Sequence, residues 1–274
     1  VGNVQSATYK AYRYQNMNLV GKINRGAYNI VLTSKDPNAN LKLTASGLYD
    51  EKNPTVKVNG TINKLDLNKI GFYSSPMTLA GAIDGDFKSL DPDNLNGYLN
   101  LKNFAISDTK EVYPMQEVKL LAVSTADSTQ IKFNSQLADV ALNGKYKLTQ
   151  IFGALSQTVN QYYQFQKPEK AAKIDAGQFF TVNATIKNDD LIRKFVPDLK
   201  SFETININGN YNADTQKIEL DAKIPQVLYG SNSLENTNLK ITNENQALQY
   251  QLDVAALKSE SFALNKIDVN GDIA

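Results

Sequence analysis

Residues Thr55 to Ile62 read Thr-Val-Lys-Val-Asn-Gly-Thr-Ile, and this alternation decides the fold. Val56, Val58 and Ile62 are separated by even numbers of positions, and polar residues or Gly stand between them. Side chains of a β-strand point alternately to its two faces, so a period of two places these apolar side chains together. The stretch therefore predicts a strand with one buried face and one solvated face.

The same period of two recurs along most of the chain. It includes the pairs or triplets Leu99 and Leu101, Val118 and Leu120, Ile131 and Phe133, Ile205 and Ile207, Ile218, Leu220 and Ala222, and Leu252 and Val254. Short polar gaps such as 34–40 and 212–216 separate many of these segments, and such gaps are typical of hairpin loops between antiparallel strands. The sequence therefore predicts a mostly β protein built on a long antiparallel sheet.

A glycine motif repeats inside these strands, in which Gly is flanked two positions away on each side by an apolar or aromatic residue. The seven copies are centred on Gly21, Gly60, Gly81, Gly97, Gly144, Gly209 and Gly271. By the period of two, each Gly belongs to the apolar face, where it thins the lining and lets the strand bend. The copies are irregularly spaced, which argues against a parallel β-helix or a propeller. The motif favours a curved sheet.

A first interruption of the β pattern is predicted to be an amphipathic helix at about 150–166. Phe152, Leu155, Val159 and Tyr162 lie at helical spacing there. The polar face of this segment is poor in Lys and Arg, unlike that of helices that lie on membrane surfaces. We therefore expect the helix to dock on the end or the open face of its own sheet.

A second, shorter helix is predicted at about 188–196. Asn188 or Asp189 is suited to cap its N-terminus, and Pro197 ends it. No linker or low-complexity run separates the strands before and after the two helices. We expect residues 1–274 to form one elongated segment, with a subdivision into 1–149 and 175–274 around the first helix as the alternative.

The composition excludes several classes of function. The 274 residues contain no Cys, His or Trp, which removes thiol nucleophiles, Cys or His metal sites and the Ser-His-Asp triad. The 29 basic residues nearly balance the 28 acidic ones, so no overall field attracts nucleic acid. We expect no enzymatic activity, no cofactor, no metal and no nucleic-acid partner.

Paired carboxylates are the remaining candidates for catalysis or calcium binding. The pairs are Asp84 and Asp86, Asp91 and Asp93, and Asp189 and Asp190. All fall in predicted turns or caps, where Asp is common for backbone reasons, and none has the spacing of an EF-hand. A carbohydrate-active enzyme using Asp91 or Asp93 is the least favoured alternative.

The apolar face itself has two interpretations. It is the core of a sandwich or, if the sheet stays open and curved, a groove for an apolar ligand. At ~0.8 kcal/mol per buried CH₂, an acyl chain of sixteen carbons needs on the order of 12 kcal/mol of apolar shelter, so a lipid path must be continuously apolar. A sandwich core has the same requirement, and periodicity alone leaves both open.

Three stretches carry a resemblance to a known family: residues 95–103, which read Leu-Asn-Gly-Tyr-Leu-Asn-Leu-Lys-Asn, residues 141–148, and residues 190–211. With the glycine motif, they resemble the TamB-type proteins of Bacteroidota, within the AsmA-like group. The resemblance implies a β-taco, which is a long sheet folded into a half-pipe with an apolar interior. It also implies a periplasmic location, with a tether to the inner membrane that would precede Val1, and no catalytic residues.

The function that this resemblance implies is phospholipid transport between the inner and outer membranes, with assembly of outer-membrane β-barrel proteins through a partner barrel. The predicted path for the acyl chains is lined by Val58, Ile62, Leu99, Leu101, Leu120, Phe133, Leu142, Leu220 and Leu252. Two rival hypotheses remain. The first is a module that binds barrel strands at a sheet edge. The second is a structural or adhesive β-sandwich with a dry core.

Overall fold

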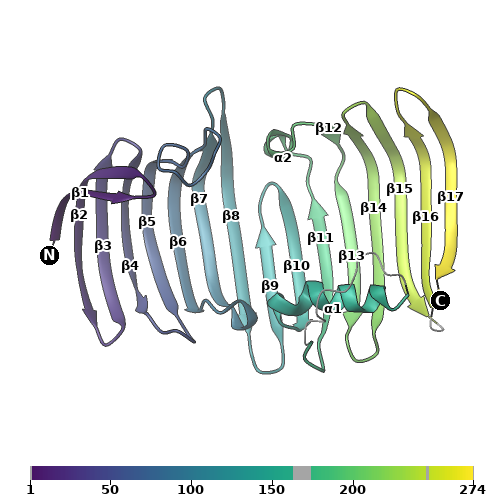
Figure 1. The fold of residues 1–274 in the computed structure, drawn as a ribbon, viewed down its shortest axis with the longest axis horizontal. Helices are drawn as coiled ribbons and strands as arrows, with labels where there is room; N and C mark the ends of the chain where they lie inside the picture. The colour runs from purple at the N-terminus through teal and green to yellow at the C-terminus, as the bar shows by residue number, and fades with distance from the viewer. Residues whose placement is uncertain (1, 163–173, 245–246, 274) are drawn as a thin grey trace. The chain divides into compact units, whose positions relative to one another are not determined.

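A computed structural model describes residues 2–162, 174–244 and 247–273 (Figure 1). The protein is mostly β, and strands account for about two thirds of the described residues. The described residues form 17 strands of open antiparallel sheet, together with two α-helices and one 3₁₀ helix. The predicted fold class, a mostly β protein with an open antiparallel sheet, is confirmed. The end of the first predicted helix, 163–166, lies outside the described residues.

The chain divides into two compact units, 1–123 and 124–274, which we call unit 1 and unit 2. The strands of unit 1 are β1 (Gly2–Tyr9), β2 (Tyr12–Asn24), β3 (Ala27–Asp36), β4 (Ala39–Leu48), β5 (Thr55–Asp66), β6 (Thr78–Ser89), β7 (Asn96–Ser107) and β8 (Val112–Ser124). Each pairs with the next along the chain in an antiparallel ladder. The 3₁₀ helix η1 (Pro92–Asn94) precedes β7.

Unit 2 follows the same rule with one variation. Its strands are β9 (Thr129–Asn134), β10 (Ala138–Lys145), β11 (Phe179–Ile186), β12 (Leu199–Phe202), β13 (Ile205–Asn212), β14 (Lys217–Tyr229), β15 (Asn232–Glu244), β16 (Ala247–Lys258) and β17 (Ala263–Ile273). β12 and β13 follow one another along the same edge of β14, and β13 also pairs with β11. Among the described residues, no ladder joins β9 to β17 or β1 to β8.

The ladders hold the apolar residues of successive strands in register. Val58 on β5, for example, pairs with Ala45 on β4 and with Gly85 on β6. Directly paired residues on neighbouring strands lie on the same face of a sheet and form a row across the strands. Once one row is assigned to a face, the rows two residues away on either side lie on that face too. All seven motif glycines belong to the apolar rows, as the period of two predicts.

Three motif glycines, Gly81, Gly97 and Gly144, have a positive φ, a backbone reason that the sequence did not reveal. Gly97 and Gly144 have φ values of 150° and 152°, which lie in a region that favours Gly. A Cβ on Gly97 would lie 2.2 Å from the carbonyl oxygen of Asp86, and one on Gly144 would lie 2.1 Å from that of Phe179. These glycines therefore permit close approach of the neighbouring strand as well as thinning the apolar lining.

One end of unit 1 is held by a buried carboxylate. Asp36 has no exposed surface, and it accepts hydrogen bonds from the Tyr12 hydroxyl at 2.7 Å and the backbone nitrogens of Gln15 and Asn38 at 2.8 Å. Burial opposes ionisation, but these hydrogen bonds outweigh it and hold the pKa of Asp36 below its usual value. The carboxylate thereby fixes the β1–β2 hairpin against the turn between β3 and β4.

Both predicted helices are present, but the apolar side predicted for the first one, which includes Phe152, is not the side that docks. α2 (Asp190–Phe195) is capped by Asp189, whose carboxylate accepts from the Leu191 nitrogen at 2.8 Å. α1 (Leu148–Asn160) docks on the apolar face of unit 2, but Phe152 does not lie on the docked side, because 82% of its surface is exposed. The docked side is the neighbouring stripe of Leu148, Ile151, Ala154, Leu155 and Thr158.

Candidate functional site

The candidate site in unit 1 is the apolar face that runs from β2 to β8. Its rows contain Met17, Leu19, Gly21, Ile23, Tyr28, Ile30, Leu32, Ser34, Leu41, Leu43, Ala45, Gly47, Val56, Val58, Gly60, Ile62, Gly81, Ile83, Gly85, Phe87, Gly97, Leu99, Leu101, Val118, Leu120 and Ala122. None of these residues is charged. Residues between them, such as Lys57, Asn59 and Lys119, point to the opposite face. The unit is therefore amphipathic across the thickness of its sheet.

Five predicted lining residues lie on this face of unit 1. Val58, Leu99 and Leu120 share a single row, in which Gly85 separates Val58 from Leu99. Leu101 lies in the next row, opposite Ile83, and Ile62 lies opposite Gly81. The structure brings these five side chains onto one continuous surface.

The apolar face of unit 1 is only partly shielded from solvent. All five predicted residues are half-buried, and on β2 the exposed fraction reaches 41% for Leu19 and 75% for Ile23. Burial is greater toward β8, where Ala122 has no exposed surface. The described residues of unit 1 include no α-helix over this face. A closed sandwich would bury such side chains much more uniformly.

Unit 2 has an equivalent apolar face, with its rows also in register. One row contains Leu142 and Leu220, on β10 and β14, and the adjacent row contains Phe133 and Leu252, on β9 and β16. The four predicted residues are all half-buried. Leu142 packs against the residues beneath α1.

The helix α1 covers one end of the unit 2 face. The buried centre of this contact contains Tyr146, Ala154, Phe180 and Tyr211. The rings of Tyr146 and Phe180 are 6.0 Å apart, and those of Phe180 and Tyr211 are 5.3 Å apart. Burial raises the pKa of Tyr146 to about 12, because its phenolate would lose hydration in this apolar surrounding.

A cavity of about 270 Å³ lies beside the C-terminal half of α1. Ala154, Thr158, Ile174, Tyr211 and Ala213 form its less polar part, and amide and carboxyl groups surround it. The Thr158 and Tyr211 hydroxyls are 3.0 Å apart, and the Tyr211 hydroxyl also donates to the Ala154 carbonyl at 3.1 Å. These hydroxyls are hydrogen-bonded within an otherwise apolar contact.

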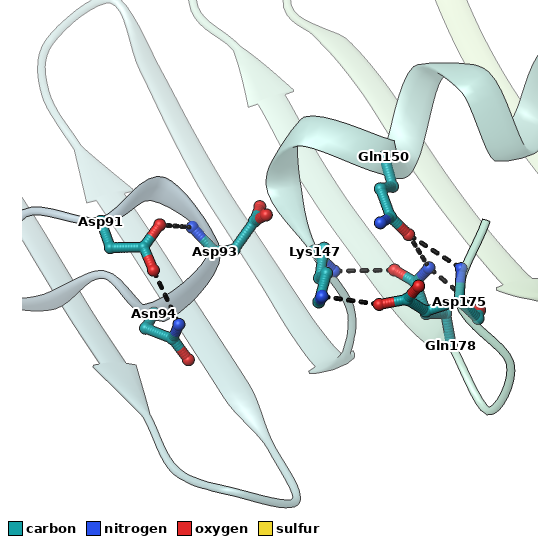
Figure 2. A network of polar contacts seen from close by, with 7 residues as sticks. All are labelled: Asp91, Asp93, Asn94, Lys147, Gln150, Asp175 and Gln178. Carbon is teal, nitrogen blue, oxygen red and sulfur yellow. Dashed lines mark hydrogen bonds and ion pairs between the residues drawn. The ribbon is translucent and has the colours of Figure 1, made fainter. Parts of the chain in front are cut away.

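A polar network fastens the N-terminal end of α1 to the segment before β11 (Figure 2). The Lys147 ammonium pairs with the Asp175 carboxylate at 2.6 Å, and the Lys147 backbone nitrogen donates to the Gln178 side chain at 2.7 Å. The Gln150 amide oxygen accepts from the Gln178 amide at 2.6 Å and from the Asp175 backbone at 3.0 Å. Direct hydrogen bonds therefore hold this end of the helix.

The carboxylates considered for catalysis have local structural partners. Asp91 caps η1, accepting from the Asp93 backbone nitrogen at 3.0 Å and from the Asn94 amide at 2.8 Å (Figure 2). Asp86 pairs with Lys88 at 2.9 Å. In the part of the chain that the structure describes, no cluster of three or more Asp or Glu side chains is arranged to hold a metal ion. These contacts give Asp86 and Asp91 structural roles.

Comparison with known proteins does not assign the chain to a family. No family model, curated protein or solved structure matches this chain. The resemblance to TamB-type proteins therefore stays a hypothesis. Across the described residues, neither helix combines the length and apolar character needed to cross a membrane.

Sequence reasoning missed the aromatic cluster under α1 and the network beside it. Phe180 could have been assigned to the apolar face from the sequence, because it starts the alternation that continues through Val182 and Ala184. The contact between Gln150 and Gln178 had no sequence signal, since ordinary polar residues 28 positions apart carry no pattern.

Proposed function

We propose that this protein binds the acyl chains of phospholipids along its apolar face and passes them between the inner and outer membranes, as a periplasmic segment of a TamB-type protein. The observation that carries the proposal is the partly exposed face of unit 1, whose rows from Met17 to Ala122 contain no charged residue and continue over seven strands from β2 to β8. Asp36, beyond Ser34 on the same face of β3, marks the end of these rows. Contiguous apolar surface left open to solvent is typical of an interaction site. Acyl chains slide along such a surface without a cofactor.

The two neighbouring residues Val58 and Asn59 provide a test, because they point to opposite faces of β5. We expect Val58→Arg to weaken binding of a phospholipid with a fluorescent acyl chain by about tenfold or more, since a guanidinium among the acyl contacts costs well over ~1.4 kcal/mol. Asn59→Arg, on the exposed polar face, should leave the affinity unchanged. Fluorescence titration of the purified chain measures both.

A fold control accompanies this pair. Circular dichroism establishes whether Val58→Arg is folded, and Val58→Thr, of nearly equal volume, should shift the affinity in the same direction by less. Equal affinity of folded Val58→Arg and Asn59→Arg would show that Val58 does not line the acyl path. Two other functions predict different results. A module that binds strands at its sheet edge relies on backbone hydrogen bonds, so its binding should not respond to the Val58 change. A sandwich with a dry core should bind no lipid in any variant.

A further inference from the structure

The helix α1 lies on the apolar face of unit 2 along the direction in which the strands succeed one another (Figure 1). Beneath it lie Leu142 on β10, Phe180 on β11, Tyr211 on β13 and Ile218 on β14. Its 13 residues extend for roughly 20 Å at ~1.5 Å each, which is about four strand spacings of ~4.8 Å. The helix therefore occupies the surface that an acyl chain running across the strands would use.

The contact made by the C-terminal half of α1 buries small side chains at its centre. The two fully buried helix residues are small, Ala154 at 3% exposure and Thr158 at 2%. The cavity of about 270 Å³, which is partly open to solvent, lies beside them. The Tyr211 hydroxyl joins this half of the helix to the sheet through Thr158 and Ala154.

The two ends of the helix differ in how they are held. Its N-terminal end is fixed by the network of Lys147, Gln150, Asp175 and Gln178. Its sequence contributes little stability, because Lys147 provides no side-chain cap, Gly153 lies in its interior and the last turn has no basic residue. The C-terminal half is held by uncharged groups: the Tyr211 hydroxyl and, just beyond the helix, the Tyr162 hydroxyl, which accepts from the Asn243 amide at 3.2 Å. We take this half to be the more easily displaced.

We propose that α1 is the resident occupant of the apolar face of unit 2, and that an acyl chain binds there by displacing its C-terminal half while the polar network retains its N-terminal end. This inference rests on the proposed lipid-binding function. The apparent affinity of unit 2 for acyl chains is reduced by the fraction of molecules in which the helix is docked, whereas unit 1 carries no such penalty. A change that weakens the helix contact should therefore raise the affinity of unit 2 for acyl chains and leave that of unit 1 unchanged.

Tyr211→Phe tests the inference, because it removes the hydroxyl and keeps the ring. The probe is a fatty acid that carries a photoreactive diazirine, and mass spectrometry of peptides locates the label. Loss of hydrogen bonding at this position should increase labelling of β11, β13 and β14 at subsaturating probe by about fivefold. Labelling of unit 1 should stay unchanged. Tyr229→Phe is the matched control, since the Tyr229 side chain is exposed and its hydroxyl bonds to Asp198 at 3.4 Å, outside the α1 contact.

Hydrogen exchange supplies a second readout on the unaltered chain. Addition of the fatty acid should accelerate amide exchange in residues 154–160 while the N-terminal turn of α1 stays protected. Equal labelling of the two units in the unaltered chain, with no change in helix exchange, would overturn the inference and leave the lipid-binding proposal intact. Absence of label from both units would overturn both.

Discussion

Phe180→Ala is expected to destabilise unit 2 by about 3–5 kcal/mol, the range for removing a large buried aromatic side chain. Phe180 is 7% exposed and lies between the rings of Tyr146 and Tyr211 beneath α1. The cavity left by the ring opens under the helix, so α1 should detach as the sheet loosens. Urea unfolding followed by circular dichroism measures the free energy, and hydrogen exchange of α1 reports the detachment.

The adjacent residue gives the matched control for this change. Phe179 points to the opposite face of β11 and is 45% exposed. Phe179→Ala should therefore alter the free energy of unfolding by less than about 1 kcal/mol. Similar losses from the two substitutions would show that the apolar face of unit 2 is not the side that packs.

Gly97→Ala is expected to destabilise unit 1 by about 3 kcal/mol, because backbone strain and overpacking each cost about 1–3 kcal/mol. The φ value of 150° disfavours any Cβ, and the new methyl group would also lie 2.2 Å from the Asp86 carbonyl oxygen. The neighbouring strand would have to move away, which disturbs the ladder between β6 and β7. Thermal unfolding of the purified chain measures the loss.

Gly85→Ala is the control for the substitution at Gly97. Gly85 belongs to the same apolar face, but its φ is not positive, and the nearest atom to an added Cβ is the Tyr98 carbonyl oxygen at 3.1 Å. A small shift accommodates the methyl group, so the loss should be clearly smaller than at Gly97. If Gly85→Ala is the more damaging change, the close approach of strands at Gly97 is not a constraint on the fold.

The strands and their apolar face were predictable because alternation is a local property of the sequence. Residues 55–62 carry the complete pattern, and the motif glycines mark the rows to which they belong. The rows could also be anticipated from hairpin connections, since short loops force neighbouring strands to be antiparallel. The positions of Val58, Leu99 and Leu120 on one surface follow from this rule.

The orientation of α1 was mispredicted because two apolar stripes overlap on it. Phe152 is its largest apolar residue and suggests one docked side, whereas the sheet accepts the stripe that contains Ala154 and Thr158. The buried hydroxyl of Tyr211 selects this arrangement by bonding to both of them. Such contacts depend on tertiary structure. The four hydrogen bonds to the Asp36 carboxylate, one of them from Tyr12, were unpredictable for the same reason.

The central claim is that acyl chains lie on the apolar face, and photocrosslinking from two neighbouring positions tests it most directly. A benzophenone amino acid replaces either Leu99, on the apolar face, or Asn100, which pairs with Asp84 and Lys119 on the polar face. After irradiation in the presence of phospholipid, mass spectrometry measures the lipid adduct. Our account predicts abundant adduct from position 99 and little from position 100. Equal yields at the two positions, or a higher yield at position 100, would contradict it.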